Sequence, residues 1–159
     1  MLTGLINREE LAKRLEHHLG HERRRPGVPA VLYCDVDFFK SINDTDGHAC
    51  GDIVLRQTAE RITSVLRDTD DVARIGGDEF VVLLADVTDA VSAREVAEKI
   101  RAAVAKPIRV DDDTINITLS VGVALAETDM ESHYLLRNAD QALYQAKDQG
   151  RDQTVVFGI

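Results

Sequence analysis

The first apolar residues of the chain recur at helical spacing. Leu11, Leu15 and Leu19 are four positions apart, so they share one face of a helix. Asn7, with a glutamate three positions later, has the pattern of a capping box. We therefore predict a helix that begins at Asn7 and ends at residues 21–29, a basic stretch with prolines that is typical of an exposed connection.

A buried strand is predicted next. Residues 30–34 read Ala-Val-Leu-Tyr-Cys, a nearly continuous apolar run that is typical of a strand buried on both faces. The run stops at Asp35, Val36 and Asp37, so carboxylates stand at the end of the strand. Apolar residues at helical spacing across 52–66 then predict a second helix.

A β-hairpin has the clearest local pattern in the chain. The strand-like runs 72–75 and 80–84 flank the four residues Gly-Gly-Asp-Glu. We expect the turn to present two acidic side chains, Asp78 and Glu79.

The remaining pattern completes a single domain. It predicts helices over 92–105 and 131–149, a strand over 114–126 and a last strand over 154–157. Helices and strands alternate without an internal repeat or a low-complexity linker. We predict an α/β (α+β) fold in which helices flank a central mixed sheet.

Composition narrows the possible functions. The chain has 159 residues and a net charge of -9, because 28 acidic residues outnumber 19 basic ones. Such a charge argues against binding to nucleic acid. The sequence has neither the apolar run of a membrane span nor the pattern of a secretory signal, which predicts a cytoplasmic domain without membrane contact. Cys34 and Cys50 lack a metal-binding spacing, and we treat them as ordinary thiols.

Three acids could meet in space. If the first strand lies beside the hairpin, Asp35 approaches Asp78 and Glu79. Clustered carboxylates repel one another unless a cation joins them, and oxygen ligands of this kind suit Mg²⁺ or Mn²⁺ together with substrate phosphates. The alternative interpretation is that each acid is a solvated turn residue.

Five segments together resemble the GGDEF family, the diguanylate cyclases. Residues 74–80, Arg-Ile-Gly-Gly-Asp-Glu-Phe, are similar to its signature. The family's opening motif, metal and guanine segment, late strand and last helix have counterparts at 2–8, 35–52, 120–124 and 139–151. The order and spacing also agree, so the resemblance covers the whole chain.

The resemblance implies a fold akin to the adenylyl cyclase catalytic domain and the polymerase palm, in which the central sheet is mainly antiparallel. It implies condensation of two GTP into cyclic di-GMP, with release of two pyrophosphates, across a transient homodimer. Asp35, Glu79 and the backbone carbonyl of Val36 would hold Mg²⁺ or Mn²⁺, and Asp78 would lie near the attacking 3′-hydroxyl as ligand, base or both.

The substrate-binding residues are also implied by the resemblance. Asn43 and Asp52 match the positions that read guanine, which favours GTP. Gly76 and Gly77 would let the backbone approach the nucleotide closely. Without the family, Asn43 would be interpreted as a turn residue, Asp52 as a helix N-cap, and the glycines as a preference of a tight hairpin.

Phosphate contacts are expected from two segments. Phe38, Phe39 and Lys40 match a loop whose backbone amides contact phosphates. Lys147 and Arg151 would reach the β and γ phosphates from the end of the last helix, where the spacing is i, i+4. The alternative for these two cations is a solvated basic face or an interaction with the helix dipole.

A regulatory site is predicted separately. Arg67 and Asp70 match the family's product-inhibition motif, and Lys99 stands where a second arginine is usual. Lysine lacks the planar fork of arginine, so weaker inhibition is expected. The alternative is a helix-end ion pair. The chain also departs from the family at Asp46, where an apolar residue is usual, and at Asp152, where asparagine is usual.

The chain is expected to be a single GGDEF domain, residues 1–159, excised from a longer protein with a sensory or phosphodiesterase domain. This expectation arises because the chain begins one residue before the opening motif. An alternative function is a regulatory module of a tandem cyclase and phosphodiesterase protein that binds GTP or cyclic di-GMP. Residues 107–113 resemble the corresponding stretch of such proteins.

Overall fold

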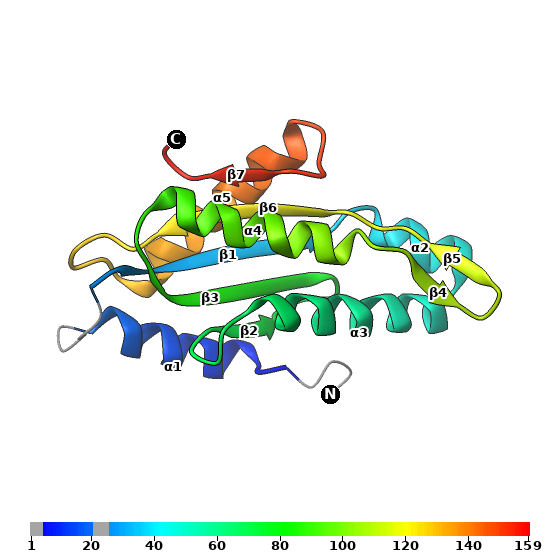
Figure 1. Ribbon diagram of the computed structural model, residues 1–159, viewed down its shortest axis with the longest axis horizontal. Coiled ribbons are helices and arrows are strands. Elements are labelled where there is room, and N and C mark those ends of the chain that lie inside the picture. Colours follow the sequence, from blue (N-terminus) through cyan, green and yellow to red (C-terminus); the bar gives the residue numbers. More distant parts are fainter. Residues whose placement is uncertain (1–4, 21–25) are drawn as a thin grey trace.

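A five-stranded sheet forms the centre of the protein (Figure 1). The computed structural model describes residues 5–20 and 26–159, so part of the opening motif and part of the predicted connection 21–29 lie outside the described residues. The strand order is β2-β3-β1-β6-β7, and neighbours are antiparallel except β6 and β7. The prediction of a mixed, mainly antiparallel sheet is confirmed. The strands are β1 (Val28–Val36), β2 (Asp71–Arg74), β3 (Glu79–Val87), β6 (Leu119–Leu125) and β7 (Thr154–Val156).

Helices cover both faces of this sheet and give it two apolar cores. Alternate β1 residues such as Leu32 and Cys34 pack with α3 (His48–Val65) and α4 (Ala90–Val104). Val31, which points the other way, packs with α1 (Arg8–Leu19) and α5 (Ser132–Asp148). Because both faces are buried, β1 is nearly apolar throughout, and its few polar residues gather at its end.

The predicted first helix is confirmed at its start. The side chain of Asn7 accepts a hydrogen bond of 2.9 Å from the backbone N–H of Glu10. The carboxylate of Glu10 accepts from Arg14 Nε at 3.0 Å, one turn further along the helix. Asn7 is therefore the N-cap.

Two segments differ from the prediction. The helix predicted over 52–66 begins at His48, and a further helix, α2 (Phe39–Asp46), precedes it. Gly47 separates the two with a φ of 90°, a backbone conformation that glycine adopts without strain. The interpretations of Asn43 as a turn residue and of Asp52 as an N-cap are therefore wrong, because both residues lie within helices.

The predicted strand over 114–126 is also divided. Its first part, β5 (Asp113–Ile115), pairs with β4 (Ile108–Val110) in a separate two-stranded sheet, and only β6 joins the central sheet. Ile108 and Ile117 are buried in the same apolar core as residues of α3 and α4, so this hairpin extends that core.

Candidate active site

The pairing of β1 with β3 brings the predicted acids together. Asp35 and Glu79 are register partners across the two strands. The backbone N–H of Val36 donates to the backbone carbonyl of Asp78 at 3.2 Å, which fixes the signature turn against the end of β1. The expectation that the three acids meet is confirmed as a matter of geometry.

Burial and like charge act together on Asp35. The residue is 6% exposed, and burial raises its pKa to about 6, aided by a hydrogen bond and repulsion from Asp78 and opposed by Lys147. The Lys147 ammonium contacts Asp35 Oδ2 from α5. Lys147 therefore offsets part of the cost of ionising this buried carboxylate.

The acidic group fits a divalent metal ion that is shared with a substrate. Asp35 Oδ1 is buried and receives no hydrogen bond from any residue in the described chain, which leaves a strong oxygen ligand unused. Over residues 5–20 and 26–159, no three His, Cys, Asp or Glu side chains are arranged to hold a metal ion by themselves. Mg²⁺ commonly binds through one or two carboxylates and takes its other ligands from water and phosphates, so the residues present fit it.

The signature turn is held by an arginine that the sequence analysis did not single out. Arg74 donates from Nε and Nη2 to the carbonyl of Gly77 at 3.1 and 2.8 Å. A Cβ built on Gly76 would lie 3.2 Å from Glu79 Oε1, whereas one on Gly77 would meet no atom within 4 Å. Gly76 therefore makes room for the Glu79 carboxylate, and Gly77 leaves the outer side of the turn open.

The predicted guanine-reading residues come from two consecutive helices. Asn43 lies on α2 and Asp52 on α3. A Cβ built on Gly51 would be only 1.8 Å from Asn43 Oδ1, so the missing side chain of Gly51, the residue before Asp52, lets the Asn43 amide lie against α3. Gly51 was missed, although a glycine within a helix costs about 1 kcal/mol relative to alanine and so often marks a close contact.

The predicted phosphate loop is in fact the start of a helix. Phe38 is the N-cap of α2, with a φ of 58°, and Phe39 and Lys40 are its first two residues. The first N–H groups of a helix have no intrahelical acceptor, and the helix dipole favours an anion there. The expectation that backbone amides of this segment contact phosphates therefore has a structural basis, while its description as a loop holds only for Phe38, which lies in a turn.

The two predicted cations do not share a helix. Lys147 is in the last turn of α5, but α5 ends at Asp148 and Arg151 lies beyond it. The N–H of Arg151 donates to Ala146 O at 2.9 Å and that of Gly150 to Lys147 O at 3.3 Å, the pattern of a Schellman motif with Gly150 at a φ of 112°. This reversal carries Arg151 back over the ring of Phe38, at 5.0 Å from the guanidinium carbon to the ring centroid.

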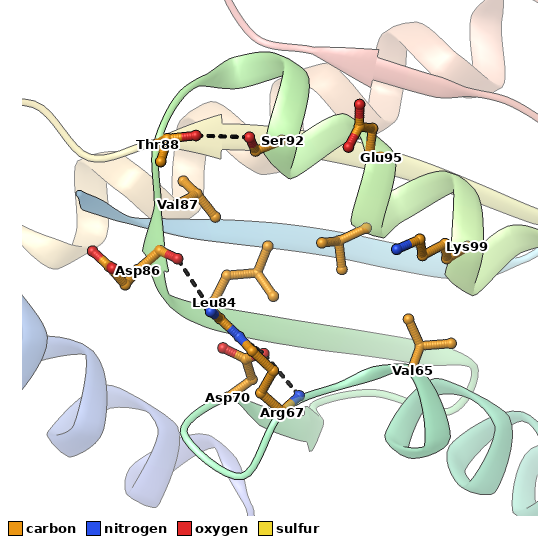
Figure 2. Close-up of a pocket in the computed structure, with 11 residues that line it drawn as sticks. Val65, Arg67, Asp70, Leu84, Asp86, Val87, Thr88, Ser92, Glu95 and Lys99 are labelled. Atoms are coloured by element: carbon orange, nitrogen blue, oxygen red, sulfur yellow. Dashed lines mark hydrogen bonds and ion pairs between the residues drawn. The ribbon is translucent and has the colours of Figure 1, made fainter. Parts of the chain in front are cut away.

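The predicted inhibitory residues line one hollow of about 350 Å³ (Figure 2). Arg67 and Asp70 lie between α3 and β2, and Lys99 and Glu95 line the hollow from α4. Arg67 Nε is 3.4 Å from Asp70 Oδ2, so the alternative of a helix-end ion pair is also realised. Arg67 donates in addition to the carbonyl of Asp86 at 2.9 Å and remains 59% exposed, which leaves its guanidinium accessible to a ligand.

The fold and the order of these residues agree with one protein family. A family model described as "Diguanylate cyclase, GGDEF domain" matches residues 1–153. The chain belongs to the GGDEF family.

Curated and solved relatives agree with this assignment. The chain is 41% identical over 157 residues to the bifunctional diguanylate cyclase/cyclic di-GMP phosphodiesterase MucR of Pseudomonas aeruginosa, covering 98% of the chain and 23% of MucR. The crystal structure of the GGDEF domain of TpbB, also called YfiN, from the same species has a TM-score of 0.92 at 41% identity, with 99% of each chain covered. The GGDEF domain of DgcB from Caulobacter crescentus, solved in complex with c-di-GMP, has a TM-score of 0.92 at 29% identity and covers 100% of this chain and 95% of that one.

This GGDEF domain therefore spans about a quarter of the length of MucR. None of the helices within residues 5–20 and 26–159 combines the length and the apolar character that crossing a bilayer requires.

Two further residues of the GGDEF domain lie next to the acids, and its sequence motifs assigned a role to neither of them. Tyr33 precedes Asp35 by two positions on the same face of β1, and burial together with the charges of Glu79 and Asp140 raises its pKa to about 12. Asp37 follows the strand and is 3% exposed. An aspartate that is almost fully buried has no sequence signal that separates it from the solvated acids around it.

Proposed function

We propose that this GGDEF domain is a diguanylate cyclase, which condenses two GTP into cyclic di-GMP and two pyrophosphates with Mg²⁺ or Mn²⁺. The observation that carries the proposal is the register pair of Asp35 and Glu79, with an unused carboxylate oxygen on Asp35. The diguanylate cyclase names of the relatives support the same reaction.

The acids act as metal ligands in this proposal. Asp35, Glu79 and the carbonyl of Val36 would hold the ion, which would neutralise phosphate charge and lower the pKa of the attacking 3′-hydroxyl. Asp78, which contacts Asp35, would act near that hydroxyl as ligand, base or both. Lys147, which neutralises Asp35 in the structure, then becomes available to the β and γ phosphates.

The remaining residues hold and select the nucleotide. The Asn43 amide and the Asp52 carboxylate face the guanine edge, where a carboxylate accepts from the N–H groups that adenine lacks, so we infer a preference for GTP. The N-terminus of α2 and Arg151 bind the triphosphate, and Gly76 and Gly77 allow it to approach the turn.

One domain supplies half of the reaction. Each 3′-hydroxyl attacks the α-phosphate of the GTP held by the other copy, so two copies must face each other in a transient dimer. We place the reaction in the cytoplasm, where GTP is available, and assign the hollow of Arg67, Asp70 and Lys99 to inhibition by cyclic di-GMP. We further infer that a sensory or phosphodiesterase domain accompanies this domain in a longer protein, as the 23% coverage of MucR suggests.

The bifunctional name of MucR favours a second candidate, a module that binds GTP or cyclic di-GMP and regulates an attached phosphodiesterase. Incubation of the chain at high concentration with GTP and Mg²⁺, with an EDTA control, separates the two by chromatography. Metal-dependent cyclic di-GMP supports the cyclase. Binding of a non-hydrolysable GTP analogue without product at any chain concentration supports the regulatory module.

A further inference from the structure

Asp37 is the most heavily hydrogen-bonded carboxylate near the proposed active site. Its Oδ2 accepts from the hydroxyl of Thr118 at 2.6 Å and from the backbone N–H of Asp152 at 3.0 Å. Its Oδ1 accepts from the hydroxyl of Ser120 at 2.6 Å, and its own N–H donates to the carbonyl of Thr118 at 2.9 Å. One buried side chain thus joins the end of β1, the start of β6 and the segment after α5.

The backbone around Asp37 is unusual. Of the described residues other than glycine, five have a positive φ, and three of them adjoin Asp37. Phe38 follows it directly with a φ of 58°, and Arg151 and Asp152 have φ values of 65° and 47°. Such conformations are unfavourable for bulky side chains and persist where the surroundings hold them. The hydrogen bond from Asp152 N–H to Asp37 is such a restraint.

The same carboxylate lies near Arg151, a residue proposed to bind the phosphates of the nucleotide. Arg151 Nη1 is 3.9 Å from Asp37 Oδ1, and the Arg151 guanidinium lies over the ring of Phe38. Phe38 in turn is the N-cap of α2, the other proposed phosphate contact. Asp37 is therefore linked to both segments that would bind the triphosphate: its carboxylate contacts Asp152 and Arg151, and its backbone leads directly into Phe38.

We propose that Asp37 is a positioning residue for phosphate binding, which holds Arg151 and the N-terminus of α2 at a fixed separation. The inference rests on the proposed function, because that function assigns the phosphates to these two segments. Asp37 itself is fully engaged by protein donors and does not contact the nucleotide in this proposal. Its effect should therefore grow with the number of phosphates on the ligand.

Calorimetric titration with Mg²⁺ tests the proposal, using a non-hydrolysable GTP analogue and GMP on the same chain. Asp37→Asn keeps the size of the side chain but removes its charge and one acceptor. We expect Asp37→Asn to lower the affinity for the GTP analogue about tenfold and the affinity for GMP by less than about twofold. In an Arg151→Ala background the same change should cost less than about threefold, because the residue it positions is gone.

Asp148→Asn is the matched control. It removes an exposed carboxylate three residues before Arg151 and leaves the hydrogen bonds of Asp37 in place. We expect both ligands to bind it as they bind the wild type. A tenfold loss with this control would show a general charge effect and overturn the proposal, as would equal losses of GMP and the GTP analogue in Asp37→Asn.

Thr118→Val serves if Asp37→Asn fails to fold, since it removes one hydrogen bond to the same carboxylate. A smaller loss with the same dependence on phosphate number supports the proposal, and no such dependence overturns it. Wild-type chain that binds neither nucleotide would overturn the proposed function and this inference together. Wild-type binding that Asp37→Asn leaves intact would overturn only this inference.

Discussion

Lys147 and Asp35 form an ion pair at the end of the central sheet, although one lies on the last helix and the other on the first strand. The contact gives a cation to a buried carboxylate at the place where the proposed metal ion would bind. Asp35 is thus the residue whose ionisation connects stability, metal binding and catalysis.

The pH dependence of stability should carry the signature of Asp35. Its pKa is raised from 3.8 to about 6 in the folded protein, so between these values the folded state binds a proton that the unfolded chain has released. The resulting stabilisation is complete below about pH 4 and is lost as the pH rises through about 6. Thermal unfolding in EDTA measures this: as the pH rises from 4 to 7, the Tm of the wild type should fall relative to the Tm of the Asp35→Asn variant. A constant difference would contradict the raised pKa.

Glu79→Gln should remove turnover and leave the fold in place. The amide keeps the shape of the side chain but loses the charge that binds the metal ion. We expect production of cyclic di-GMP to fall by at least about 100-fold with an unchanged circular dichroism spectrum. The exposed Glu60→Gln on α3 is the control for a loss of negative charge far from the acids. Retained activity in Glu79→Gln would rule out its assignment as a metal ligand.

Gly51→Ala should weaken guanine binding through Asn43. The added Cβ would overlap the Asn43 amide oxygen, whose distance from an ideal Cβ is 1.8 Å. We expect about a tenfold loss of affinity for the GTP analogue by calorimetry. Once Asn43→Ala has removed the amide, Gly51→Ala should cost no further affinity. Stability should change by no more than about 1 kcal/mol, because alanine favours the helix but its Cβ would still lie 3.3 Å from Phe39 Cζ. Additive losses in the double variant would contradict this.

Arg67→Ala should relieve product inhibition. The guanidinium is exposed in the hollow that Asp70 and Lys99 also line. Its loss should raise the inhibition constant for cyclic di-GMP at least about tenfold, because one charge-assisted hydrogen bond to the ligand would be removed. Lys99→Arg should act in the opposite direction, because arginine adds a planar fork for phosphate or guanine. Steady-state assays with added cyclic di-GMP measure both. Equal inhibition of all three proteins would place the inhibitory site elsewhere.

The elements that sequence analysis predicted well are those with strong local signals. The cap at Asn7, the apolar run of β1 and the hairpin around Gly76 each depend on residues close together in the chain. The missed α2 has a weaker pattern, because eight residues with one buried side chain, Phe39, give little periodicity. Arg151 was placed on a helix because spacing alone cannot show that Gly150 reverses the chain.

The sequence by itself determined the family, the mainly antiparallel sheet and the residues proposed to act on GTP, since motifs in a fixed order carry that information. Only the tertiary structure decided which of these residues support one another. The register of β1 and β3 places Asp35 beside Glu79, and the missing side chain of Gly51 leaves room for the Asn43 amide. The hydrogen bonds of Asp37 connect three segments that are distant in the sequence. These contacts depend on strand pairing and helix packing, which are long-range effects that no local pattern of residues contains.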